Sequence, residues 1–132
     1  MGMMVAYSFQ SRFVPLIREG LKTQTVRSAR KRHARPGEPI QLFRGMRTRL
    51  CEKIVPDPVC TAILPIAINF ASARINRIEV GRVPLLDLDA FAVADGFEHL
   101  DDMSAFWREH HGSRHFDGVV IEWTMPRCDG RS

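Results

Sequence analysis

The segment from residue 20 to residue 27, Gly-Leu-Lys-Thr-Gln-Thr-Val-Arg, places polar side chains on a stretch that has the character of a β-strand. Alternate residues of a strand share a face, so Thr23, Thr25 and Arg27 are predicted to point the same way. A twist or bulge at the start of the segment would bring Lys22 round to the hydroxyl groups. Polar side chains on such a face indicate a ligand site. The competing interpretation is a solvated strand built from good strand formers.

The residues on either side of this segment predict a small, strand-rich domain. A buried strand is expected at Val5–Phe9, followed by a short amphipathic helix with Pro15 in its first turn and Gly20 after its last residue. Further strands are expected at 39–44, 48–55, 59–69, 73–80 and 119–123, the first two as a hairpin. Two later helices are predicted to be capped by Asp87 or Asp89 and by Asp101 or Asp102, and to stop at Gly96 and Gly112.

These elements predict an α+β fold, mainly β: a small closed barrel of about six strands with short helices across its ends. One domain spans residues 1–132, and residues 125–132 are expected to be a frayed tail. No apolar run reaches the roughly 20 residues of a membrane span. The first residues also lack the basic region and cleavage site of a signal peptide. We therefore expect a cytoplasmic protein with no membrane partner.

Charge is distributed unevenly along the chain. Residues 11–54 carry twelve Lys or Arg against three Asp or Glu, a net charge of +9, so the remainder carries −5 of the total of +4. A basic half suits a protein that binds RNA or a nucleotide, and the alternative is an ordinary solvated surface. The loop 28–35 is predicted to be too polar to pack and to be mobile. Its candidate contacts to an RNA backbone are Arg30, Lys31, Arg32 and Arg35.

Neither a metal ion nor another cofactor is expected. The three cysteines include no Cys-x-x-Cys pair, so Cys51 and Cys60 are predicted to be small core residues, and Cys128 falls in the polar tail. The cluster His110, His111 and His115 does not have the spacing of two ligands on one helix face.

Three residue types in this sequence could act as the nucleophile, the base and the acid of an amide hydrolysis. A threonine hydroxyl such as that of Thr25 becomes a nucleophile only if a neighbour takes its proton. An amine such as that of Lys22 can take it if burial or nearby cations lower its pKa toward neutrality. A carboxylate such as that of Asp95 could then protonate the leaving amine.

Other polar and aromatic side chains are candidates for binding the substrate. The planar guanidinium of Arg27 would hold a phosphate or a base carbonyl, or else pair with an acid such as Asp95. The rings of Phe9 and Trp107 could stack on a base, although aromatic residues in such patterns more often belong to the core. The full set of predicted substrate contacts is Phe9, Gln10, Thr23, Arg27, Arg44, Arg47 and Trp107.

The chain resembles the ASCH domain, a relative of the PUA-like RNA-binding barrels, from about Phe9 to Trp123. The resemblance lies in Ser8-Phe9-Gln10, in Gly-x-Lys-Thr-x-Thr-x-Arg from Gly20, in Pro36-Gly37-Glu38, in Ala92-x-x-Asp95-Gly96-Phe97 and in His111-Gly112 with Phe116.

This resemblance implies removal of the acetyl group from N4-acetylcytidine, with Lys22 as the base and Thr25 as the nucleophile. The family's catalytic Glu falls on Asp95, whose carboxylate would lie roughly 1.5 Å short unless its helix shifts inward, and a misplacement of about 1 Å can cost a hundredfold in rate. Other ASCH proteins imply the alternatives, an RNA-binding module without catalysis or an RNA-cleaving protein.

Overall fold

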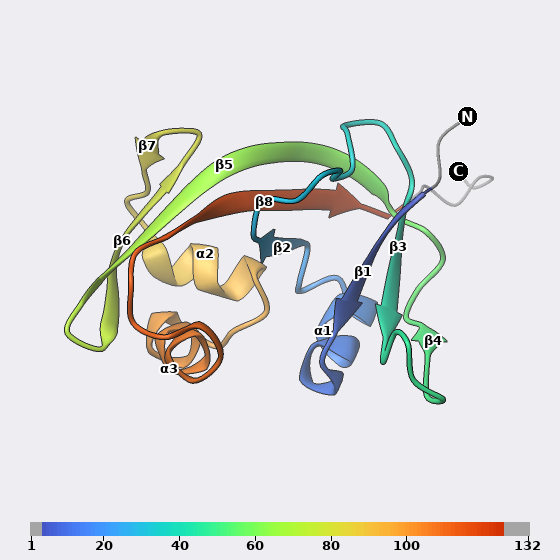
Figure 1. Ribbon diagram of the computed structural model, residues 1–132, viewed down its shortest axis with the longest axis horizontal. Coiled ribbons are helices and arrows are strands. Elements are labelled where there is room, and N and C mark those ends of the chain that lie inside the picture. Colours follow the sequence, from blue (N-terminus) through green and yellow to red (C-terminus); the bar gives the residue numbers. More distant parts are fainter. Residues whose placement is uncertain (1–3, 126–132) are drawn as a thin grey trace.

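The computed structural model describes residues 4–125. Over this range the protein is α+β, mainly β, with two sheets around one hydrophobic core (Figure 1). The strands are β1 (Val5–Phe9), β2 (Gln24–Arg27), β3 (Ile40–Arg44), β4 (Glu52–Lys53), β5 (Val59–Ala71), β6 (Arg74–Val80), β7 (Val83–Pro84) and β8 (Phe116–Thr124). The helical elements are the 3₁₀ turn η1 (Ser11–Phe13), α1 (Val14–Arg18), α2 (Leu88–Ala94) and α3 (Leu100–His111).

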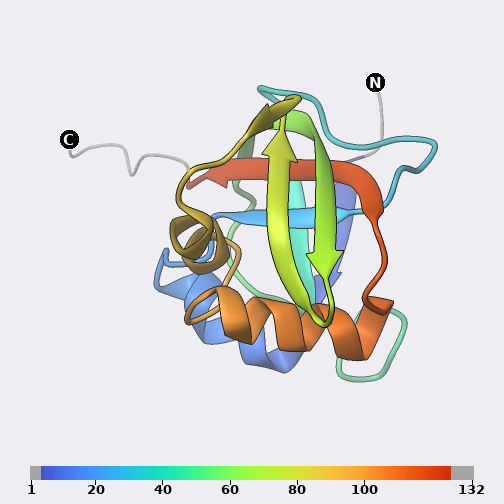
Figure 2. The same ribbon diagram turned by 90° about the vertical axis from the view of Figure 1, so that its left-hand side faces the viewer.

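The larger sheet has the strand order β2-β8-β5-β6-β7, and its two long strands β5 and β8 arch over α2 and α3 (Figure 1). The register of β5 is interrupted after Cys60 and after Asn69, and such bulges let a strand bend. Pro65 is tolerated because β6 pairs with β5 only from Ile66 onward, so no β6 residue needs its missing N–H, while its carbonyl oxygen accepts from the amide of Gly81 at 2.8 Å. Figure 2 shows α3 lying across the lower ends of β5 and β6.

The smaller sheet has the order β1-β3-β4, with β1 and β3 parallel and β3 and β4 antiparallel. The β3–β4 hairpin confirms the pairing expected between residues 39–44 and 48–55, although β4 is only two residues long. Cys51 precedes β4 and is exposed, so its predicted place in the core is wrong, whereas Cys60 is buried as expected. Cys128 and the tail 126–132 lie outside the described residues.

The two sheets do not close into a barrel, so this part of the predicted fold is wrong. Within residues 4–125, one isolated β-bridge joins Pro39, just before β3, to Val59 at the start of β5. At the other junction, β1 pairs only with β3 and β2 pairs only with β8. Side chains span this junction instead: Arg27 Nη2 donates to the carbonyl oxygen of Ser8 at 2.8 Å, and Arg30 Nη2 donates to that of Ala6 at 3.4 Å.

The helix boundaries confirm the expected glycine stops. Gly20 and Gly96 follow α1 and α2 with φ of +79° and +99°, which glycine adopts without strain. Asp87 caps α2 by accepting from the amide of Ala90. The cap expected for α3 is wrong, because His99 occupies the N-cap position and the two predicted aspartates lie in the first turn.

The basic loop 28–35 is anchored at one end, although its polar sequence predicts no packing; residues 28–31 and 35 are exposed, as that sequence predicts. Ala34 is buried, and its amide donates to the hydroxyl oxygen of Tyr7 at 3.3 Å. His33 stacks on the Tyr7 ring and lies 2.9 Å from its hydroxyl through Nδ1. Because His33 Nε2 faces the carbonyl oxygen of Ser28 at 3.0 Å, Nε2 carries the proton and Nδ1 accepts from Tyr7. One apolar residue and one buried tyrosine thus anchor the loop.

Acidification is expected to destabilise this packing through His33. Burial lowers the pKa of His33 below its ordinary value of 6.5. As pH falls below about 6.5, the unfolded chain binds a proton that the folded protein does not, so the free energy of unfolding decreases until the lower, folded pKa is passed. Thermal unfolding between pH 7.5 and pH 5 should show this loss in wild type and a flatter dependence in His33→Gln. Equally steep dependence in both proteins would contradict the assignment.

Candidate active site

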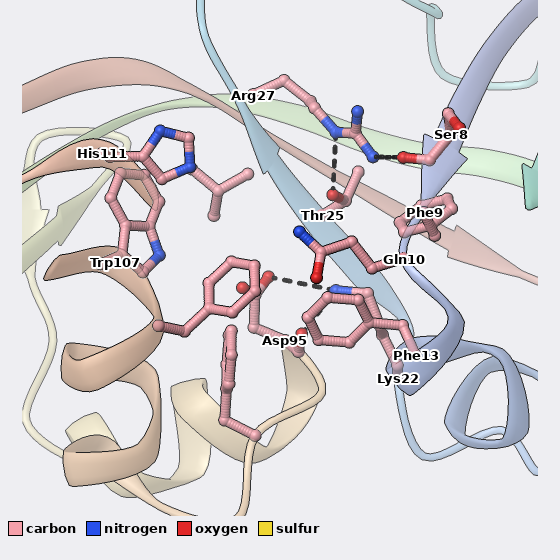
Figure 3. Close-up of a pocket in the computed structure, with 13 residues that line it drawn as sticks. Ser8, Phe9, Gln10, Phe13, Lys22, Thr25, Arg27, Asp95, Trp107 and His111 are labelled. Carbon is pink, nitrogen blue, oxygen red and sulfur yellow. Dashed lines mark hydrogen bonds and ion pairs between the residues drawn. The ribbon is translucent and has the colours of Figure 1, made fainter. Parts of the chain in front are cut away.

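A cavity of about 190 Å³ lies where β1, β2, the end of α2 and α3 converge (Figure 3). Seven of its lining residues are among the predicted site residues: Phe9, Gln10, Lys22, Thr25, Arg27, Asp95 and Trp107. The cavity is smaller than the roughly 300–1,000 Å³ typical of pockets for drug-sized ligands, so a small planar ring system suits it better.

Lys22 and Asp95 meet at one side of the cavity although 73 positions separate them in the sequence. Lys22 Nζ donates to the backbone carbonyl oxygen of Asp95 at 2.5 Å and lies 3.8 Å from its carboxylate Oδ1. Both residues are almost fully buried, with exposures of 3% and 4%. Asp95 is the C-cap of α2, so the helix end itself carries the carboxylate to the amine. The shorter side chain of Asp, relative to Glu, therefore does not keep the two groups apart.

Burial shifts both members of this pair toward their neutral forms. Desolvation lowers the pKa of Lys22 to about 8, against the attraction of Asp95, and the positive charges of Arg27 and Arg12 add to the lowering. Desolvation also raises the pKa of Asp95, although Lys22, Gln24 and Arg27 oppose the rise. An amine with a pKa near 8 has a substantial neutral fraction at physiological pH, as a general base requires.

Thr25 and Arg27 lie on the same face of β2 and point into the cavity, as the strand alternation predicts (Figure 3). Arg27 Nε donates to the Thr25 hydroxyl oxygen at 3.1 Å. No hydrogen bond joins Lys22 to the Thr25 hydroxyl within residues 4–125, and Arg27 makes no ion pair with Asp95 in that range. Arg27 is thus the cation in direct contact with the candidate nucleophile.

Aromatic rings form much of the cavity wall. Phe9, which the sequence suggested as a stacking residue, lies 4.8 Å from the guanidinium carbon of Arg27, and Phe13 lies 4.8 Å from Lys22 Nζ. Phe13 also contacts Phe97 and Phe106 edge-on. The rings present their faces to both cations and supply flat surfaces against which a base could lie.

Several predicted contacts lie elsewhere. Thr23 is exposed, and neither Arg44 nor Arg47 lines the cavity. Arg44 pairs with Glu52 at 2.8 Å. In the basic loop, Arg32 pairs with Glu38 and the guanidinium of Arg30 lies over the Tyr7 ring, whereas Lys31 and Arg35 are exposed. The cations of this loop are therefore not part of the cavity.

Sequence reasoning missed Ser8, Phe13, Val26, Phe97, Phe106 and His111 as cavity residues. The three phenylalanines have apolar helical or flanking positions, and no local pattern distinguishes a cavity wall from a solid core. His111 lies in the last turn of α3, and the sequence marks it only as a member of the histidine cluster and of the ASCH resemblance. Among residues 4–125, no three His, Cys, Asp or Glu side chains gather as a metal site would require.

Gly96 is in close contact with the cavity, and this gives a test of the site. A Cβ atom there would lie 2.8 Å from Lys22 Cδ and 2.9 Å from Phe13 Cδ1. Gly96→Ala should therefore displace Lys22 and cost about 1–3 kcal/mol more than the backbone penalty alone. Gly20→Ala is the matched control, because it has the same left-handed φ, costing about 1 kcal/mol, and no atom within 4 Å. Equal losses in urea unfolding would contradict this packing.

No protein-family model, curated protein or solved structure matches this chain. Between residues 4 and 125 there is no helix with the length and apolar character needed to cross a membrane.

Proposed function

We propose that this chain is an ASCH-type amidohydrolase that removes the acyl group from an N4-acylated cytidine. The observation that supports it best is the meeting of an amine, a carboxylate and a hydroxyl, from Lys22, Asp95 and Thr25, around one small cavity. All three side chains are buried. Charge interactions with a bound substrate are stronger there than in water. The ASCH resemblance supports the proposal by assigning catalytic roles to the same three positions.

In this proposal Thr25 Oγ attacks the acyl carbonyl carbon, and Lys22 receives the hydroxyl proton directly or through one water. The Arg27 guanidinium, already bonded to the Thr25 oxygen, stabilises the negative charge that develops on the carbonyl oxygen. The C–N bond then breaks, and the Asp95 carboxylate passes the proton held by Lys22 to the departing N4 amine. Water hydrolyses the threonine ester, which releases the carboxylic acid and restores the hydroxyl.

The direct test is incubation of the purified protein with N4-acetylcytidine, with chromatographic detection of cytidine and acetate. Both products should appear in equal amounts, and the Lys22→Ala protein should form neither. Binding of the nucleoside without turnover would favour the competing class, a nucleobase- or RNA-binding module that uses the same cavity.

The rate should depend on pH through Lys22. With a pKa of about 8, the amine is mostly protonated at pH 6.5 and mostly neutral at pH 9. Because only the neutral amine accepts a proton, kcat/KM should rise about tenfold per pH unit below that pKa and level off above it. A profile that is flat from pH 6.5 to pH 9 would exclude Lys22 as the base.

A further inference from the structure

Gln24 is buried beside the proposed catalytic groups and does not line the cavity. It is the first residue of β2, next to Thr25 in the chain, and only 6% of it is exposed. Its Nε2 lies 3.3 Å from Asp95 Oδ1. An ionised carboxylate only accepts hydrogen bonds, so the amide nitrogen of Gln24 must face it.

The carboxylate of Asp95 has no other hydrogen-bond donor among the described residues. The nearest cation, Lys22, directs its hydrogen bond to the backbone carbonyl oxygen of Asp95 and stays 3.8 Å from Oδ1. The remaining charged groups that act on Asp95 and Lys22 are Arg27 on β2 and Arg12 on η1. Neither arginine forms an ion pair with Asp95 within residues 4–125.

We propose that Gln24 is a positioning residue that fixes the orientation of the Asp95 carboxylate. One carboxylate oxygen, Oδ1, is held by Gln24, and no described residue donates to Oδ2, which leaves that oxygen for a ligand. Lys22 lies within ion-pair distance of Oδ1 but donates its hydrogen bond to the backbone carbonyl oxygen, so the carboxylate keeps acceptor capacity for a ligand. The catalytic meaning of this role rests on the proposed function, but the contact itself does not.

The test needs no substrate. Gln24→Met keeps the length of the side chain and removes the donor, and Gln24→Glu replaces the donor with a second carboxylate. The matched control is Gln41→Met. Gln41 lies on β3 and does not line the cavity. The readout is a carbon-13 NMR titration of the Asp95 carboxyl group, with circular dichroism to check folding.

The Asp95 titration midpoint should move upward by about one pH unit in Gln24→Met, because the charged form loses its hydrogen bond. It should move further in Gln24→Glu, where like charges meet, and stay unchanged in Gln41→Met. An unchanged midpoint in folded Gln24→Met overturns the proposal, and loss of folding in both Gln24 variants assigns the residue to the fold alone and also overturns it.

The result separates this inference from the proposed function. If N4-acetylcytidine is a substrate, Gln24→Met should lower kcat about tenfold or more with little change in KM. Any step in the pH profile of kcat that reports the ionisation of Asp95 should shift together with the NMR midpoint. If the wild-type protein shows no turnover and the midpoint still moves, Gln24 positions Asp95 and the amidohydrolase assignment fails.

Discussion

The Thr25→Val variant is expected to lose hydrolysis of N4-acetylcytidine by about a thousandfold or more, because valine has nearly the same shape and no nucleophilic oxygen. The change also leaves Arg27 Nε without its hydroxyl partner, at a cost of about 1–3 kcal/mol in the free energy of unfolding. The protein should therefore stay folded and inactive. Single-turnover measurement of cytidine release, beside urea unfolding, distinguishes the two effects.

Thr23→Val is the control for this change. Thr23 stands two residues earlier in the same segment but is exposed and outside the cavity, so its replacement should leave the rate within about a factor of two. Substantial turnover in Thr25→Val would exclude the threonine as nucleophile and would leave Lys22 or an activated water as the attacking group.

The Lys22→Met variant is expected to show the largest loss of stability, about 3–5 kcal/mol, because it leaves the buried Asp95 carboxylate without its cation. The segment around Lys22 carries no pattern of a core, and the sequence therefore predicts that its loss spares the fold. The structure corrects that expectation, since the side chain is only 3% exposed. Urea unfolding at neutral pH measures the effect.

Two controls separate this effect from general damage. The double variant Lys22→Met, Asp95→Leu removes both charges and should recover most of the lost stability. Breaking the exposed pair of Arg74 and Asp101, whose side chains are 63% and 66% exposed, with Arg74→Met should cost no more than about 1 kcal/mol. Similar losses in the free energy of unfolding for Lys22→Met and Arg74→Met would show that the buried pair stabilises the protein no more than an exposed one.

Features encoded by neighbouring residues could be predicted from the sequence. The alternation correctly placed Thr25 and Arg27 on one face but wrongly added Thr23, which is exposed and precedes β2. The glycines at 20 and 96 correctly marked two helix ends. These signals are local, because strand parity and left-handed φ depend on a few consecutive residues. Asp95 could be joined to Lys22 only through the ASCH resemblance, since no local pattern relates residues that far apart.

Features that depend on distant pairings could not be predicted in the same way. Barrel closure would have required β1 and β2 to pair, and nothing in either strand shows that β1 instead lies parallel to β3. The packing of loop 28–35 depends on Tyr7, whose aromatic ring and hydroxyl compensate for a polar segment. The aromatic cavity wall has the same composition as a filled core, so only the three-dimensional arrangement distinguishes them.

The edge position of β1 gives Arg27 a second role beside its contact with Thr25. An edge strand with unpaired carbonyl groups is a template onto which a strand of another molecule can add. Here the guanidinium groups of Arg27 and Arg30 occupy the carbonyl oxygens of Ser8 and Ala6. The arginine that contacts the candidate nucleophile therefore also satisfies an edge carbonyl of β1, so a substitution that retunes the cavity at Arg27 would leave that acceptor without its donor.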